Sequence, residues 1–83
     1  MRDIIENHSF AESKERLGID AKRLDEVLRG LTWVMSNDPE YFGPPVYGDH
    51  IYVAQGGTDE ERFVVWFEFN ETTVTLLYID RHP

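Results

Sequence analysis

Two arginines and a histidine occupy positions from which they could bind an anion. Arg62 opens a run of β-branched and aromatic residues, and Arg81 and His82 close the next such run. A guanidinium is permanently charged and can hold a phosphate through two hydrogen bonds, and histidine exchanges a proton near neutral pH. The simpler alternatives are that the arginines only offset neighbouring acids, and that His82 lies in a frayed terminus.

The elements that must position these residues are the strands of a predicted antiparallel hairpin, separated by the polar segment 70–73. A two-residue turn at 70–71 places Arg62 and Arg81 on the same face and at the same end of the sheet, which predicts an anion site there. An even-length loop is preferred, because an odd one would turn threonines toward the phenylalanines. This register gives one face seven apolar side chains: Phe63, Val65, Phe67, Phe69, Val74, Leu76 and Tyr78.

The opposite face of the hairpin is half apolar, and we expect it to carry the function. Its apolar members are Val64, Trp66, Leu77 and Ile79. Trp66 could stack a nucleic-acid base, but burial against a protein partner is the favoured reading of such a patch. The sequence therefore predicts a partner-binding surface at these four residues.

Two helices are predicted before the hairpin. Ser9 and Glu12 form a capping-box pattern for a helix over 10–17. Asp20 is the expected N-cap of a helix over 21–37, which the segment Asn37-Asp38-Pro39 ends. Apolar residues at three- and four-residue spacing give this second helix a single buried stripe: Leu24, Val27, Leu28, Leu31, Val34 and Met35.

The remaining segments complete an α+β fold. Residues 1–8 either form a short edge strand or pack under the first helix, and a third strand is expected over 50–55. Tyr41, Phe42 and Tyr47 of the loop before it are expected to close one end of the core. We predict one domain over 1–83, with two N-terminal helices packed on the phenylalanine face of a small antiparallel sheet, a three- to four-stranded meander.

Composition narrows the classes of function. The chain has 83 residues, a formal net charge of −8 and no cysteine, so disulfide scaffolds, thiol catalysis and cysteine zinc sites are excluded. The acidic charge disfavours broad nucleic-acid binding and suits a basic partner. His8 and His50 lack partners at metal-ligand spacing, so no metal or cofactor is expected. Without an apolar run of membrane or signal-peptide length, we expect a cytoplasmic protein.

Four segments resemble the RelE/ParE superfamily of bacterial toxins, which act in type II toxin–antitoxin pairs. They are residues 23–28, 37–42, 62–67 and 74–82, and the resemblance covers most of 9–82. It implies a helical pair on an antiparallel sheet, and an antitoxin or other protein partner on the sheet face. Some members are ribosome-dependent messenger RNA endoribonucleases, whereas others act on DNA gyrase.

By position, the resemblance implies catalytic roles for Arg62, Arg81 and His82. RNA cleavage by 2′-hydroxyl attack needs a proton acceptor, a cation on the phosphate and a proton donor for the leaving oxygen, which arginine and histidine can supply. The lysine- and arginine-rich surface of the ribonucleases is missing here, since Arg62 is the only Lys or Arg between 37 and 71. The alternative is therefore a non-catalytic, acidic protein-interaction module that kept the fold. An apolar sheet face also allows a homodimer.

Overall fold

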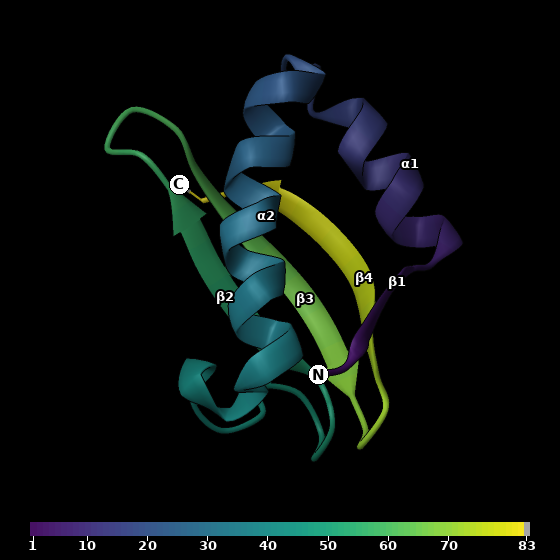
Figure 1. Cartoon of the computed structure of the whole chain (residues 1–83). Helices are drawn as coiled ribbons and strands as arrows, with labels where there is room; N and C mark the ends of the chain where they lie inside the picture. The colour runs from purple at the N-terminus through teal and green to yellow at the C-terminus, as the bar shows by residue number, and fades with distance from the viewer. Residues whose placement is uncertain (83) are drawn as a thin grey trace.

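The computed structural model describes residues 1–82 and shows two helices against a four-stranded mixed sheet (Figure 1). In chain order the elements are β1 (Asp3–Glu6), α1 (His8–Arg16), α2 (Ala21–Asn37), the 3₁₀ turn η1 (Pro39–Phe42), β2 (Tyr52–Gly57), β3 (Arg62–Phe69) and β4 (Thr73–Arg81). The strand order is β1-β4-β3-β2. The predicted α+β class and the antiparallel meander of β2, β3 and β4 are confirmed.

The expectation of a purely antiparallel sheet was wrong, because β1 joins the edge of β4 in parallel. This pairing settles the choice left open for residues 1–8. Ile4 lies opposite Val74 and Ile5 opposite Thr75, and the turn around Asn7 leads directly into α1. A parallel neighbour needs a long crossover, and here almost the whole chain lies between the two strands.

The helix α2 has the predicted bounds and the predicted N-cap. The carboxylate of Asp20 accepts a hydrogen bond from the Arg23 backbone N–H at 3.4 Å. The predicted apolar stripe packs over the sheet except for Val34, which is only partly buried and lies outside the core cluster. Gly30 has open space around it, whereas a Cβ on Gly56 would lie 2.9 Å from Leu31 Cδ1. The glycine that allows close helix–sheet packing is therefore the one in β2.

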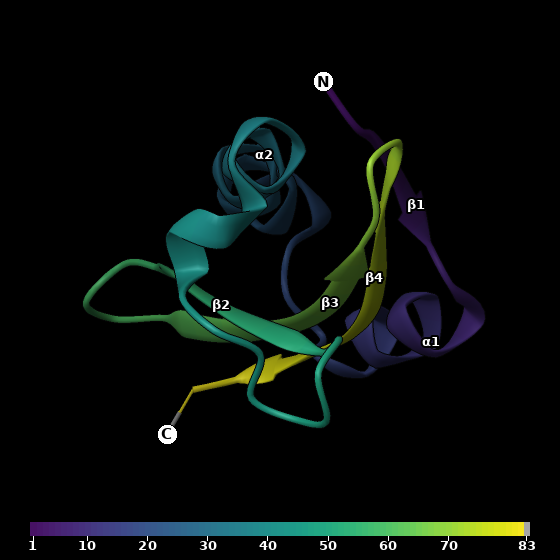
Figure 2. The ribbon, with the colours of Figure 1, turned by 90° about the horizontal axis from the view of Figure 1, so that it is seen from below.

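The helix α1 begins earlier than predicted and lies beside β4. Its N-cap is Asn7, whose side-chain oxygen accepts the Phe10 N–H at 2.8 Å, so the Ser9–Glu12 capping box was wrong. Figure 2 shows α2 over one face of the sheet and α1 along its β4 edge. Beyond the end of β1, the Ser13 hydroxyl accepts the Ile79 N–H of that edge at 3.0 Å, so α1 takes over the role of a neighbouring strand.

The core lies between α2 and the sheet, with Phe10 of α1 closing one side. Phe10, Met35, Val65, Phe67 and Val74 are each 0% exposed. Phe42 packs against the core, with its ring centroid 5.7 Å from that of Phe67.

The two tyrosines expected to close the core with Phe42 lie outside it. Tyr41 is 72% exposed and Tyr47 is 73% exposed. That part of the expectation was wrong, because Phe42 alone reaches the end of the core.

Candidate functional site

A β-bulge in β4 decides which residues share a face of the sheet. Phe69 lies opposite Val74, so four residues (70–73) separate this pair of the hairpin, and the Asn70 N–H donates to the Thr73 carbonyl at 2.9 Å. The even length was predicted correctly, but the two-residue turn was wrong. Farther along, the register shifts between Trp66 and Phe67, so that Leu77 is an extra residue in β4.

The bulge exchanges the predicted faces of Tyr78 and Ile79. Ile79 lies opposite Val65 and is 1% exposed in the core, whereas Tyr78 lies opposite Trp66 and is 37% exposed. Both expectations for these two residues were wrong, because a one-residue insertion reverses the side-chain alternation beyond it. The sequence does carry a signal of the bulge, since two leucines in succession, Leu76 and Leu77, interrupt the alternation of β4.

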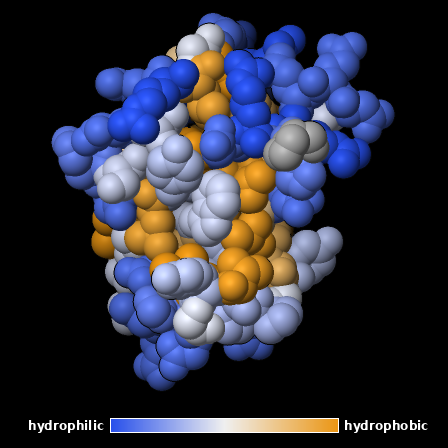
Figure 3. All heavy atoms as spheres, turned by 180° about the vertical axis from the view of Figure 1, so that it is seen from behind, coloured by the Kyte–Doolittle hydropathy of each residue, from blue (hydrophilic) through white to orange (hydrophobic). Residues whose placement is uncertain are grey.

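The surface of the sheet turned away from α2, here called the back face, has an aromatic centre. Val53, Trp66 and Tyr78 lie opposite one another across β2, β3 and β4. The rings of Trp66 and Tyr78 meet at an angle of 62° with centroids 5.5 Å apart. Figure 3 shows apolar and intermediate side chains across the middle of this face and hydrophilic ones at its upper end.

The four predicted partner-binding residues therefore differ in how much of each side chain is exposed. Trp66 and Leu77 are partly exposed, Val64 is only 9% exposed, and Ile79 belongs to the core. The aromatic surface that remains exposed at the centre of the back face comes from Trp66 and Tyr78.

The predicted convergence of Arg62 and Arg81 was also wrong. Arg81 lies opposite Phe63, a core residue, and so points to the side of the sheet occupied by α2. Its guanidinium Nη2 donates to the carbonyl of Leu17 at 3.1 Å. Leu17 is the C-cap of α1, where unpaired carbonyls and the helix dipole favour a cation. Arg81 therefore holds α1 against the end of β4.

The structure brings Arg62 together with His82 instead. The His82 N–H donates to the Arg62 carbonyl at 2.8 Å, so the two residues are opposite one another on the back face. Asp80 lies opposite Val64 and has the same orientation. Arg62, Asp80 and His82 thus lie on the same face at one end of the sheet, here called the cationic end of the back face.

The loop before β3 fixes the start of that strand. The Thr58 N–H donates to the Glu61 carbonyl at 2.8 Å, and the Glu61 N–H donates to the Thr58 hydroxyl at 3.2 Å. Gly57 has a φ of 118°, and a Cβ there would lie 2.1 Å from the Glu61 carbonyl oxygen. An ion pair between Arg23 and Glu61 attaches the loop to α2. The position of Arg62 is therefore set by a hydrogen-bonded turn that requires glycine.

The surroundings of Arg62 are open to a ligand. Its side chain is 60% exposed, and its Nη2 lies 3.8 Å from a carboxylate oxygen of Asp59, itself fully exposed. Such an exposed pair is weak and exchanges readily with other anions. A hollow of about 270 Å³ beside Arg62 is lined by Gln55, Gly56 and Gly57. The Arg62 guanidinium at this hollow can bind a phosphate group, and His82 lies opposite Arg62 in the sheet.

The other histidines pair locally. His8 contacts Glu12 one turn along α1, and His50 Nδ1 lies 3.2 Å from the Asp49 carboxylate. Among residues 1–82, no group of three or more His, Asp or Glu side chains is placed to hold a metal ion.

No helix within residues 1–82 combines the length and apolar character needed to cross a membrane. No family model, curated protein or solved structure matches this chain.

Proposed function

We propose that this protein is a RelE/ParE-like toxin of a type II toxin–antitoxin pair, acting in the cytoplasm as a ribosome-dependent messenger RNA endoribonuclease. The observation that carries the proposal is the pairing of Arg62 with His82 at the open end of the back face. The succession of a helical pair and an antiparallel meander agrees with the resemblance noted in the sequence. The Arg62–His82 pairing and the order of the elements are both present although the hairpin register differs from the predicted one.

In the proposed reaction the 2′-hydroxyl of RNA loses its proton and its oxygen attacks phosphorus. The bond from phosphorus to the 5′-oxygen breaks, the 5′-oxygen gains a proton, and a 2′,3′-cyclic phosphate remains. Arg62 binds the phosphate oxygens and offsets the charge that grows on them. His82 donates the proton to the leaving oxygen, and Asp80, on the same face of the sheet, accepts the proton of the 2′-hydroxyl.

Arg81 has a supporting part in this proposal. Its hydrogen bond to Leu17 holds α1 beside the end of β4, directly before His82 in the chain. The catalytic role that the resemblance implied for Arg81 is therefore replaced by a positioning role. The aromatic pair Trp66 and Tyr78 lies farther along the same face and is where we place the antitoxin.

A second candidate function is a non-catalytic protein-interaction module. The observations that favour it are the net charge of −8, which repels RNA, and the ion pair that already engages Arg62 with Asp59. In this case the aromatic centre of the back face carries the whole function, and the cationic end only balances nearby acids.

The deciding experiment is reporter translation in a bacterial cell-free extract, with cuts in the messenger mapped by primer extension. We expect ribosome-dependent cuts with the wild-type protein, a loss of at least 100-fold with Arg62→Ala, and no change with Lys22→Ala, which removes an exposed charge on α2. Equal cutting by Arg62→Ala would refute the role of Arg62. Intact messenger with the wild type would refute the ribonuclease proposal, and a supercoiling assay with DNA gyrase would then separate a gyrase toxin from a module.

A further inference from the structure

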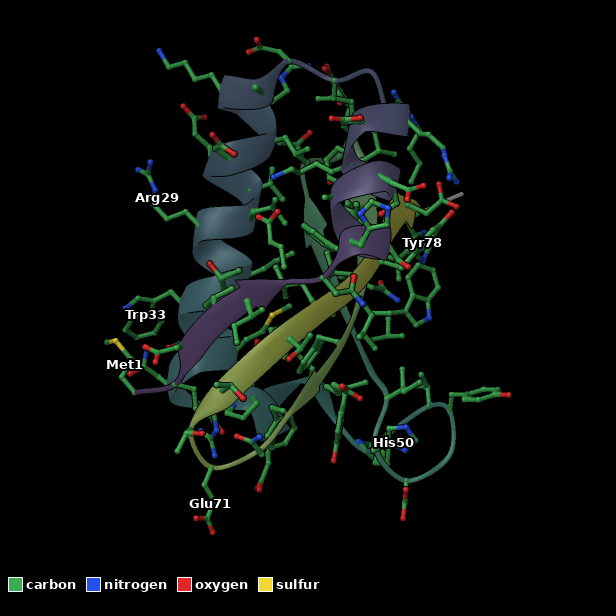
Figure 4. The ribbon with its side chains drawn as sticks, turned by 90° about the vertical axis from the view of Figure 1, so that its right-hand side faces the viewer. Met1, Arg29, Trp33, His50, Glu71 and Tyr78 are labelled. Atoms are coloured by element: carbon green, nitrogen blue, oxygen red, sulfur yellow. The ribbon has the colours of Figure 1, made fainter. Side chains whose placement is uncertain are left out.

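The strand β2 is a free edge of the sheet. Its only neighbour among the described strands is β3, whereas Figure 4 shows β1 and α1 along the opposite side, where they cover β4. The Arg62 carbonyl accepts the His82 N–H on the β4 side, so Gly57, opposite Arg62, directs its backbone groups away from β3. Since this direction alternates along a strand, Val53 and Gln55 direct theirs outward too.

The β2 edge lacks the features that usually keep a free edge from pairing. Natural edge strands are protected by charged side chains, proline or bulges. The sequence of β2 is Tyr-Val-Ala-Gln-Gly-Gly, and β2 is the only described strand without a charged residue. It pairs with β3 without a shift of register. The other edge strand, β1, carries Asp3 and Glu6. The uncharged edge therefore favours pairing with another uncharged strand.

The helix α2 adds an apolar flank to this edge. Val27, Gly30 and Val34 recur at helical spacing along one side of α2. Val27 and Gly30 line a hollow of about 420 Å³ between α2 and β2, together with Gly56 and Gly57 of the strand. Gly30 is exposed and has open space around it. Because glycine has no Cβ, the flank allows a second helix to approach closely.

We propose that two copies of this chain pair through their β2 strands, antiparallel, about a two-fold axis at Gln55. Gln55 of one copy then lies opposite Gln55 of the other, and Val53 lies opposite Gly57. All three residues direct their backbone groups outward, so about six hydrogen bonds can form. The pairing ends before Ile51, whose backbone N–H and carbonyl already bond to Tyr47. The proposal concerns assembly, and it does not depend on RNA cleavage.

The side chains of this edge fit a second copy, as an isologous interface requires. Val53 belongs to the back face, opposite Trp66, and the pairing sets it over Gly57 of the other copy. The hollow of about 270 Å³ beside Arg62 is lined in part by that glycine and has room for the valine. The two Gln55 amides can hydrogen-bond to one another. A paired copy has this hollow filled, so pairing would compete with an anion there.

The charge of the chain predicts how the pairing responds to salt. Two chains of net charge −8 repel one another at long range, although the edge itself is uncharged. Salt screens this repulsion and leaves backbone hydrogen bonds and apolar contacts in place. Raising the salt concentration should therefore strengthen the pairing. The binding of a basic partner segment to this acidic chain would instead weaken with salt.

The test measures sedimentation equilibrium at several protein and salt concentrations. Gln55→Glu and Gln55→Lys each set like charges opposite one another at the axis, which destabilises a strand pair, and an equal mixture of the two sets Glu opposite Lys. Ser9→Glu and Ser9→Lys make the same charge changes at an exposed position of α1 and are the matched controls. Gln55→Pro removes an outward N–H, a change that edge strands tolerate. Circular dichroism checks that every variant is folded.

We expect a wild-type dimer that tightens as salt rises, with slowed hydrogen exchange at the Val53 and Gln55 amides. Each charge variant at Gln55 should weaken the dimer about 5-fold, and the mixture should restore it. Gln55→Pro should abolish the dimer, whereas the Ser9 variants should match the wild type. A wild type that stays monomeric at about 1 mM in high salt, a dimer that Gln55→Pro leaves intact, or a mixture no tighter than either variant alone would overturn the proposal.

Discussion

Replacing Ser13 by alanine tests how α1 is attached to the edge of the sheet. Ser13 is 2% exposed, and its hydroxyl donates to the Phe10 carbonyl at 2.9 Å while it accepts the Ile79 N–H at 3.0 Å. Alanine would leave the Ile79 N–H buried without its partner. An unsatisfied buried donor costs about 1–3 kcal/mol, so we expect the free energy of unfolding to fall by about 2 kcal/mol.

In a domain of this size a loss of about 2 kcal/mol lowers the melting temperature by roughly 8–16 °C. The change is measured by urea and thermal unfolding, with hydrogen exchange at the Ile79 amide as a local readout. Ser9→Ala is the matched control, because Ser9 lies in the same helix and is exposed, and it should change stability by less than about 0.5 kcal/mol. A Ser13→Ala protein as stable as the control would refute the view that α1 satisfies this edge of β4.

Two further predictions concern the cationic end. Gly57→Ala should cost more than about 2 kcal/mol, because alanine is strained at positive φ and its Cβ would lie 2.1 Å from the Glu61 carbonyl. Gly18→Ala, also at positive φ but with nothing within 4 Å of the new Cβ, should cost only about 1–2 kcal/mol. If the two alanine variants have equal melting temperatures, the close contact between residue 57 and the Glu61 carbonyl does not contribute to stability. Arg62→Ala should leave stability within about 0.5 kcal/mol of the wild type, so that any lost activity reflects chemistry and not folding. Circular dichroism melting checks this, and a marked drop in melting temperature would show a structural role.

The sequence predicted the parts of the fold that depend on local pattern. The buried stripe of α2 follows from the helical spacing of its apolar residues, and its N-cap follows from one side-chain acceptor at Asp20. The alternation of β3 and of the first half of β4 likewise predicted a shared core face, including Val74 and Leu76. These predictions were confirmed because the local secondary-structure preference of each segment agrees with the burial of one of its faces in the fold.

The features that escaped prediction depend on distant parts of the chain. The parallel pairing of β1 with β4 joins residues about seventy positions apart, and nothing in residues 1–8 alone specifies it. The bulge at Leu77 is stabilised in part by α1, whose Ser13 accepts the N–H of Ile79 two residues later. A pattern read along one strand cannot include a partner contributed by a helix.

The bulge also changed the candidate site. An unbroken alternation would have paired two arginines on the back face, whereas the shifted register sends Arg81 to the end of α1 and sets His82 opposite Arg62. A guanidinium next to an imidazole can both bind a phosphate and move a proton. Two guanidinium groups could do only the first, so the proposed ribonuclease chemistry rests on the observed register and not on the predicted one.

The measurement that tests the cationic end most directly is an NMR titration of the ¹⁵N-labelled protein with a short 2′-O-methylated RNA, which cannot be cleaved. If the cationic end binds a phosphate backbone, the largest shifts will fall on the Arg62 guanidinium and the His82 ring. The Arg81 guanidinium, which is bonded to Leu17, should change little. Shifts centred on Arg81, or a spectrum unchanged at millimolar RNA, would contradict an RNA site at the paired Arg62 and His82.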